Sequence, residues 1–336
     1  MRSKITALGA LAVAAALTLA GCSNGGSTPA PTNGGGDAPA PSEDFKVVAF
    51  TSGNQTPVGA WWVKAVTEKA EELGWDLTMV QGDFDFQKMN PAVESAIGQG
   101  ADIVFDGYTD YASIGSIVTA AKDAGIPIFA IDSGTEPTDA FVVNVTTDQQ
   151  VLVDQTLGAI SEALGGLEGK NVMVIGHDPH AGIRMRASLA EADLKAAGAN
   201  IAGGSIQKVQ SPATGRTEAL TLVADYLAAN PNGLDAVWVG WDDAALGAAQ
   251  AINEAGAKAV VTGSDAVAEA IAGILSDGAF LATSMQPWPE VLDMVIADIE
   301  EYRATGTLPS TNFVAVEPTL VDASNAKDIT PSDQLG

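Results

Sequence analysis

The most constraining feature of this sequence is a regular alternation of short apolar runs with longer amphipathic segments, which begins at residue 46. A short apolar run predicts a buried strand, and apolar residues spaced three and four apart predict a helix. The first series predicts strands at 46–50, 77–80, 102–105 and 126–131, with helices at 61–73, 87–97 and 112–124. These strands have no polar face, which is typical of a parallel sheet covered by helices on both sides.

The same alternation starts again after residue 148. It predicts strands at 171–175, 205–209, 236–239, 259–262 and 280–284, and helices at 151–164, 183–197, 217–229, 244–255, 266–275 and 290–302. A chain of 336 residues also has the length of two average domains. We therefore expect an α/β protein with two similar Rossmann-like domains, each built on a parallel sheet, although no exact sequence repeat relates the two halves.

The amino terminus has the pattern of an export signal. Arg2 and Lys4 precede an apolar run at 5–20, which is shorter than the roughly 20 residues needed to span a bilayer. The run ends in Leu-Ala-Gly-Cys, which resembles the bacterial lipobox, and Cys22 is the only cysteine. We expect a signal peptide at 1–22, lipidation of Cys22 and a flexible linker at 23–44, rich in Gly, Pro, Ser and Thr. A stray cysteine in an ordinary secretory signal is the alternative.

Charge and missing motifs exclude several function classes. Sixteen Lys and Arg against 42 Asp and Glu give a net charge of -26, which repels the phosphates of nucleic acids. No nucleophile elbow, no phosphate-binding glycine loop and no catalytic cysteine is present. We expect a binding protein with no nucleic-acid partner, metal, cofactor or catalytic residue. Two carboxylates about 5–10 Å apart would suffice for a glycosidase, so a glycoside-processing enzyme remains an alternative.

The candidate site follows from the geometry of parallel sheets. Ligands of open α/β sheets bind beyond the carboxyl ends of the strands, so the residues just after each predicted strand are the candidates. Polar and aromatic side chains occupy these positions, and the predicted ligand-binding residues are Asn54, Trp61, Trp62, Asp132, Arg186, Trp241, Asp265 and Gln286. Carboxylates, amides and a guanidinium suit the hydroxyls of a sugar, and indole rings stack on its C–H faces.

Each kind of candidate also has a structural explanation. An Asp after a strand can cap the next helix, and one of the adjacent Trp61 and Trp62 is expected to face its own core. Arg186 can pair with a surface acid. His177 and His180 lie three residues apart in a predicted loop, but no third metal ligand accompanies them.

Several segments at or near the ends of predicted strands follow one another along the chain in an order that is typical of one protein family. They are Ala124-Gly125-Ile126-Pro127-Ile128 before Ile131-Asp132, then Thr147-Asp148, Arg184-Met185-Arg186, Trp241-Asp242-Asp243, Gly263-Ser264-Asp265 and Ala282-Thr283-Ser284-Met285-Gln286. On these segments, the chain from residue 47 to about 321 resembles the type I periplasmic sugar-binding proteins, which include ribose-, galactose- and xylose-binding proteins. The resemblance implies ligand-binding roles for Asp132, Arg186, Asp265 and Gln286.

The chain departs from the ribose-binding pattern at specific positions. Ser133 stands where that pattern has a second arginine, and Trp241 stands where it has an asparagine. The paired phenylalanines of the first loop are also missing, and Trp61 and Trp62 follow a few residues later. The missing arginine removes one forked hydrogen-bond donor from the expected pocket, and the tryptophans add aromatic surface to it. We therefore expect a ligand larger or less polar than ribose, such as a hexose, a disaccharide or a polyol.

The resemblance also implies an architecture with three chain crossings between the domains, near 147–148, 286–287 and 315–316. The N-terminal domain then comprises 45–147 and 287–315, and the C-terminal domain comprises 148–286 and 316–336. The three crossing segments form a hinge about which the domains close on the ligand.

The family function is solute binding for an ABC importer. A monomeric lipoprotein on the outer face of the cell membrane would bind a pentose, hexose, disaccharide or polyol and hand it to the permease. A nucleoside, an autoinducer-like furanose or an amino acid is the alternative ligand.

Overall fold

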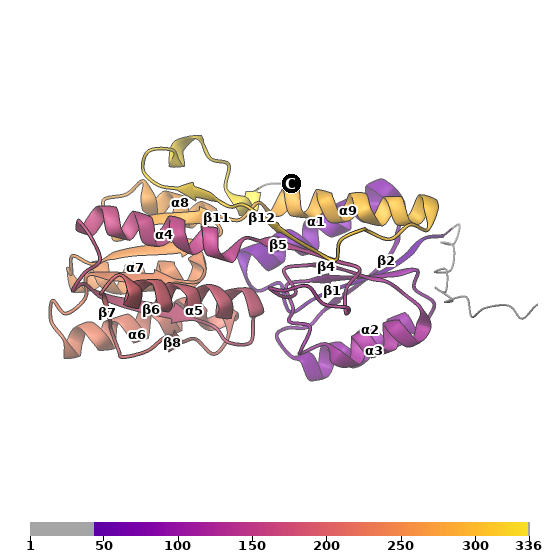
Figure 1. Cartoon of the computed structure of the whole chain (residues 1–336), viewed down its shortest axis with the longest axis horizontal. Helices are drawn as coiled ribbons and strands as arrows, with labels where there is room; N and C mark the ends of the chain where they lie inside the picture. The colour runs from indigo at the N-terminus through magenta and orange to yellow at the C-terminus, as the bar shows by residue number, and fades with distance from the viewer. Residues whose placement is uncertain (1–43, 335–336) are drawn as a thin grey trace, which may run out of the picture. The chain divides into compact units, whose positions relative to one another are not determined.

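A computed structural model describes residues 44–334, which belong to one compact unit, and they form two mainly parallel β-sheets with helices on both faces (Figure 1). The predicted α/β class is confirmed. The predicted signal peptide at 1–22, Cys22 and nearly all of the 23–44 linker lie outside the described residues. Within residues 44–334, no helix is both long and apolar enough to cross a membrane.

The first sheet has six strands in the order β12-β5-β4-β3-β1-β2, and all of its strand pairs are parallel. Its strands are β1 (Lys46–Thr51), β2 (Asp76–Gln81), β3 (Ile103–Gly107), β4 (Ile128–Ile131), β5 (Val143–Thr147) and β12 (Phe313–Val316). Its helices are α1 (Pro57–Leu73), α2 (Phe86–Ile97), α3 (Gly115–Ala124) and α9 (Trp288–Thr305).

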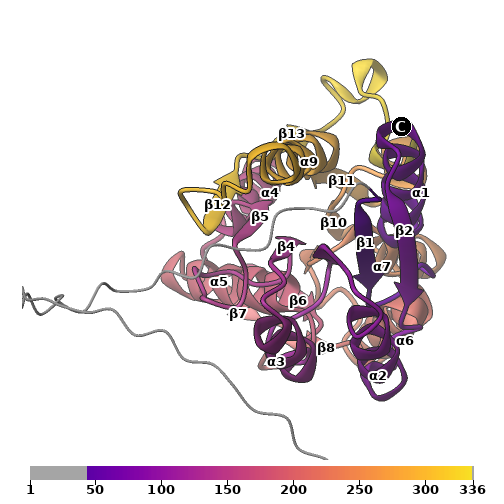
Figure 2. The same ribbon diagram turned by 90° about the vertical axis from the view of Figure 1, so that its right-hand side faces the viewer.

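Alternation along the strands explains why both faces of this sheet are covered. Val47 and Ala49 of β1 pack in the core that α1 and α9 share, whereas Val48 and Phe50 pack in the core of α2 and α3. Figure 2 shows α1 and α9 on one side of these strands and α2 and α3 on the other. A strand with two apolar faces needs a helix layer on each face to remove both from water.

The second sheet has seven strands in the order β13-β11-β10-β9-β6-β7, with β8 also paired to β6. Its strands are β6 (Asn171–Gly176), β7 (Asn200–Ile201), β8 (Gln207–Lys208), β9 (Ala236–Val239), β10 (Val260–Ser264), β11 (Phe280–Met285) and β13 (Thr319–Val321). Its helices are α4 (Gln149–Leu164), α5 (Ala181–Ala196), α6 (Gly215–Ala229), α7 (Asp242–Ala255) and α8 (Ala268–Ile274). Only β13 is antiparallel to its neighbour, β11, among the described strands.

The chain passes between the sheets three times, after β5, after β11 and after β12. The strand and helix pattern of the sequence does not predict β5, β7, β12 or β13, and it predicts β8 as a longer strand. Short strands carry little apolar periodicity, and β5 in addition has the polar Asn144 as its second residue. The division into 45–147 with 287–315 and 148–286 with 316–336 stays a prediction, and the membership of the two sheets supports it.

The last described residues connect the two halves by contact. The short helix η3 (Ser332–Gln334) packs against α1 and against α8. The Ser332 amide donates to the Ala266 carbonyl at 2.9 Å, and the Asp333 carboxylate accepts from the Ala268 amide at 2.9 Å. The carboxyl-terminal segment therefore contacts α1 beside the first sheet while it is hydrogen-bonded to the second half of the chain.

Two helical glycines should respond in opposite ways to replacement by alanine. A Cβ on Gly247 of α7 would lie 1.9 Å from the Arg216 carbonyl oxygen of α6, whereas a Cβ on the exposed Gly158 of α4 would meet nothing within 4 Å. We expect Gly247→Ala to lower the free energy of unfolding by about 1–3 kcal/mol, because the helices must separate. Gly158→Ala should raise it by about 0.5–1 kcal/mol, because alanine is a better helix former.

Urea unfolding of the two variants beside the parent measures both effects. Equal effects of the two substitutions would contradict the close packing of α6 against α7.

Candidate ligand-binding site

A cavity of about 650 Å³, counting the space open to solvent, lies where the two sheets point the carboxyl ends of their strands toward one another. Tyr108 and Asp132 enter it from the ends of β3 and β4, and Asp265 and Gln286 enter it from the ends of β10 and β11. Arg186 of α5 and Trp241 at the start of α7 complete the second side. Both halves of the chain therefore supply polar groups to one space, as the strand-end rule predicts.

The structure brings most of the predicted site residues together. The ones that line this cavity are Asp132, Arg186, Trp241, Asp265 and Gln286. The other three, Asn54, Trp61 and Trp62, do not line it. Asn54 is exposed in the loop before α1, so its amide is in solvent.

Trp61 and Trp62 lie in the core between α1 and the first sheet instead of in the cavity. Trp62 is fully buried and packs edge to face against Phe105, with ring centroids 5.5 Å apart. Gly107 leaves room for this indole, because a Cβ there would lie 2.5 Å from the Trp62 ring. The aromatic surface that the sequence analysis assigned to this pair comes from other residues.

Four aromatic side chains line the cavity: Phe84, Tyr108, Trp241 and Trp288. Tyr108 and Trp288 pack edge to face with centroids 5.0 Å apart. The Tyr108 hydroxyl and the Nε1 atoms of Trp241 and Trp288 are buried and have no hydrogen-bond partner among residues 44–334. Buried polar atoms are almost always paired in native proteins, so three unpaired ones on residues of a single cavity lining are an exception.

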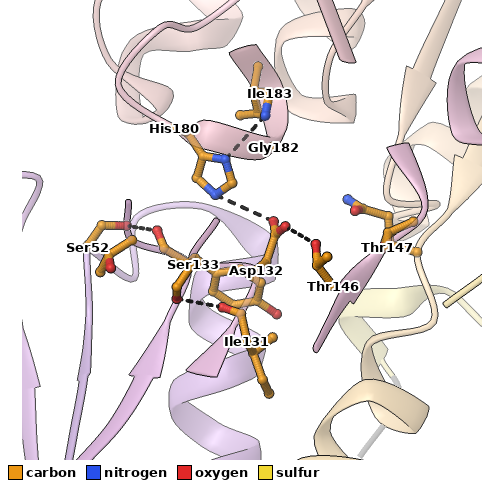
Figure 3. A network of polar contacts seen from close by, with 12 residues as sticks. Ser52, Ile131, Asp132, Ser133, Thr146, Thr147, His180, Gly182 and Ile183 are labelled. Carbon is orange, nitrogen blue, oxygen red and sulfur yellow. Dashed lines mark hydrogen bonds and ion pairs between the residues drawn. The ribbon is translucent and has the colours of Figure 1, made fainter. Parts of the chain in front are cut away.

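Asp132, which lines the cavity, is the centre of a network of polar contacts (Figure 3). Its carboxylate is 2% exposed and accepts from the Thr146 hydroxyl at 2.5 Å. The His180 Nε2 atom lies 3.6 Å from the same carboxylate, so α5 of the second half reaches a strand end of the first. His180 caps α5, since its Nδ1 accepts from the Ile183 amide at 3.3 Å.

Burial lowers the pKa of His180 to about 4, against the opposing effect of the nearby Asp132 charge. The imidazole is therefore neutral at neutral pH. His177 is also buried, and its Nδ1 lies 2.9 Å from the Val209 carbonyl oxygen. No group of three metal-ligating side chains occurs within the described range 44–334.

Arg186 is 1% exposed and its guanidinium is held by neutral acceptors. Nε donates to Gln149 Oε1 at 2.8 Å, Nη1 donates to the Gly240 carbonyl at 3.0 Å, and Nη2 lies 3.4 Å from Gln286 Oε1. Burial lowers the pKa of Arg186, and the charges of Asp132 and Asp265 oppose this shift. No carboxylate within 44–334 forms an ion pair with it, so the cation remains available to a ligand.

Asp265 and Gln286 extend this network. Gln286 Nε2 donates to Asp265 Oδ1 at 2.6 Å. Burial raises the pKa of Asp265 well above its ordinary value, and the neighbouring charge of Asp242 raises it further. A carboxyl group with a raised pKa can donate a hydrogen bond to a ligand hydroxyl when it is protonated. When it is ionised, it accepts one.

Asp242 was not among the predicted ligand-binding residues, and it supports the loop that carries Asp265. It is fully buried, accepts from the Thr283 hydroxyl at 2.7 Å and accepts from the Val267 amide at 3.0 Å. Burial raises its pKa to about 7. The strand-end rule points to it, since it follows β9, but its side chain holds the 265–267 loop instead of lining the cavity.

Backbone strain concentrates at the cavity. Phe84, Tyr108, Asp132 and Asp265 all line it with positive φ angles of 59, 60, 49 and 126°. Such angles are uncommon outside glycine and cost free energy, so they persist where the surrounding packing holds them. Tyr108 and Trp288 could have been found by the same strand-end rule, whereas Phe84 lies in a loop after β2 that carries no apolar periodicity.

The arrangement provides many donors and acceptors in a mostly buried space with aromatic faces. That combination suits a small molecule with several hydroxyl groups and a C–H face.

Comparison with known proteins agrees with this fold. The chain is 26% identical over 291 residues to the D-apiose import binding protein of Actinobacillus succinogenes, covering 84% of this chain and 90% of that relative. It is 28% identical over 248 residues to the ribose import binding protein of Bacillus subtilis, covering 73% of this chain and 77% of that relative. These relatives are import binding proteins and not enzymes.

Solved structures share the fold. A solute-binding protein of an ABC transporter from Agrobacterium vitis, with bound allitol, superposes with a TM-score of 0.77 at 21% identity and covers 85% of this chain and 98% of its own. The family model for the periplasmic binding protein domain matches residues 47–302. The chain therefore belongs to the type I periplasmic sugar-binding protein family.

Proposed function

We propose that this protein is the solute-binding component of an ABC importer and that it binds a small carbohydrate or polyol in the cavity between its two sheets. The observation that carries this proposal is the position of Asp132, Arg186, Asp265 and Gln286 around one buried space, beside three unpaired polar atoms on aromatic rings. Its relatives are sugar and polyol import binding proteins, and members of the family act outside the cytoplasm.

The relatives' different ligands support a compound with several hydroxyl groups as the proposed ligand, but they do not identify which compound it is. Import binding proteins for D-apiose and ribose, a galactofuranose-binding protein and a xylitol-binding protein match this chain. The pocket differs from the ribose-binding pattern at Ser133, whose hydroxyl donates to the Ile131 carbonyl at 3.0 Å and is fully buried. Ser133 therefore provides no replacement for an arginine fork. A pentose, hexose, disaccharide or polyol stays the proposed ligand class, and a nucleoside, furanose signal or amino acid is the alternative.

Ligand binding in this proposal is coupled to closure of the two halves about the three crossing segments. Two contacts already join the halves at the cavity. Asp132 faces His180 at 3.6 Å, and Asp110 after β3 forms an ion pair with Arg184 of α5 at 2.8 Å. Only the closed arrangement lets one ligand use acceptors and donors of both halves, so the ligand shifts the population toward it.

Attachment to the membrane is proposed from the sequence. A lipidated Cys22 followed by the linker at 23–44 would hold the binding protein on the outer face of the cell membrane, near the permease that receives the ligand. Roughly 22 linker residues would give a reach of about 25 Å if the linker is flexible.

A melting panel tests the proposed function directly. Residues 45–336 are heated with pentoses, hexoses, disaccharides, polyols, nucleosides and amino acids in separate samples. A ligand at 100 times its Kd adds about 2.7 kcal/mol to the free energy of unfolding, so the cognate class should raise Tm by several degrees. A shift with nucleosides or amino acids and none with sugars or polyols would overturn the ligand class while leaving the fold intact.

Replacing one site carboxylate should weaken binding without unfolding the protein. Asp132→Asn keeps the shape and tolerates the positive φ of 49°, but it exchanges an acceptor oxygen for a donor. We expect Kd for the panel's tightest ligand to rise tenfold to a hundredfold by calorimetry, as for a hydrogen bond to a charged group worth about 1.5–3 kcal/mol. Asp123→Asn, at an exposed position on α3, is the matched control. Equal affinity of the Asp132 variant and the control would place the site elsewhere.

Acid should weaken the folded state through His180. Its folded-state pKa is about 4, below the ordinary 6.5, so the unfolded chain binds more protons between these values. The free energy of unfolding therefore falls as pH drops from 6.5 to 4, by at most about 1.4 kcal/mol per pH unit from this group. His180→Asn keeps a helix-capping side chain and removes the titration. Urea unfolding from pH 4.5 to 7 should show a shallower decline for the variant, and identical declines would contradict a buried neutral imidazole.

A further inference from the structure

A second cavity, of about 660 Å³ counting the space open to solvent, adjoins the ligand-binding cavity. The two share Ser52, Phe84, Tyr108, His180 and Pro212 in their walls. The second cavity therefore lies directly beside the first, with these five residues common to both linings.

The lining of the second cavity differs in chemistry from that of the first. Phe84, Phe86, Pro179 and Pro212 supply apolar surface, and neither Arg186 nor Asp132, Asp265 or Gln286 reaches it. Its one lining carboxylate, Asp110, is already paired with Arg184 at 2.8 Å.

Several of the remaining polar groups of this lining are bonded within the protein itself, whereas the Tyr108 hydroxyl has no partner among residues 44–334. Thr109 donates its hydroxyl to Asp106 at 2.6 Å, and the Ser211 hydroxyl accepts from the Ala213 amide at 3.3 Å. The His177 Nδ1 faces the Val209 carbonyl, an acceptor, so Nδ1 carries the proton and Nε2 is left as one acceptor. The lining thus offers few partners for the hydroxyls of a second sugar ring, and an unpaired hydroxyl there would cost free energy.

We propose that the natural ligand has two parts: a sugar or polyol held in the first cavity and an apolar or aromatic substituent held in the second. This inference rests on the proposed function and defines the ligand class of the same site. The substituent contacts the apolar part of that lining, which comprises Phe84, Phe86, Pro179 and Pro212. His177, whose ring packs at 6.4 Å against Trp241 of the first cavity, connects the two subsites.

Matched ligand pairs test the proposal. The probes are the mono-O-methyl and mono-O-benzyl derivatives of the panel's tightest sugar or polyol, with the substituent at each hydroxyl in turn. For at least one position, the benzyl derivative should bind at least tenfold more tightly than the methyl derivative by calorimetry. Burial of the additional apolar surface provides the gain.

A variant that fills the second cavity supplies the structural control. Gln210 lines that cavity only, is exposed, and uses its backbone amide to donate to Glu218 at 2.8 Å. Gln210→Trp should remove the tenfold benzyl gain and leave the affinity for the unsubstituted sugar unchanged. Gln250→Trp, at an exposed position on α7 that lines neither cavity, should retain the gain.

The outcomes separate this inference from the proposed function. If the unsubstituted sugar binds but no benzyl derivative exceeds its methyl partner at any position, the two-part ligand is overturned and the sugar-binding function stands. Retention of the benzyl gain in Gln210→Trp would also overturn the assignment of the substituent to this cavity. If no sugar or polyol binds at all, the proposed function itself fails.

Discussion

Burial of both faces of the two parallel sheets decides where this protein can do chemistry. Apolar residues occupy both sides of β1, because α1 and α9 cover one face and α2 and α3 cover the other. Polar side chains can then meet a ligand only beyond the ends of the strands, where no helix layer covers the sheets. Since both sheets direct their carboxyl ends to one cavity, the polar residues of two separate chain segments meet there.

The second half of the site depends on a buried polar chain from Arg186 through Gln286 and Asp265. Each link is a hydrogen bond between side chains or to a backbone carbonyl, so the buried guanidinium is held in place at each of its three nitrogens while N–H groups remain for a ligand. Asp242 accepts a hydrogen bond from the Val267 amide and so holds the loop in which Asp265 has a positive φ angle. Fixed side chains lose little conformational freedom when a ligand arrives, and this preorganisation favours tight and selective binding.

Sequence patterns predict the helices of this protein and most strands, and the strand-end rule finds Asp132, Asp265 and Gln286 without knowledge of the fold. The rule fails for Trp62, because that residue lies inside α1, where helical spacing governs orientation. Its spacing with Val66 and Ala70 on the buried face is a signal for a core position. Phe84 could not be predicted, because its position depends on the positive φ angle of a loop and on the approach of the second half of the chain.

The route of the chain has a consequence for how the protein folds. The first sheet is completed by β12, whose Phe313 pairs with Asn144 of β5, and its core is completed by α9 near the end of the chain. A nascent chain that has emerged only as far as β5 therefore exposes the apolar face that α9 later covers, including Tyr108 and Phe129. Contacts so distant in sequence slow folding, because a long loop must close before they form. The first half to be synthesised is thus not the first half that can finish folding.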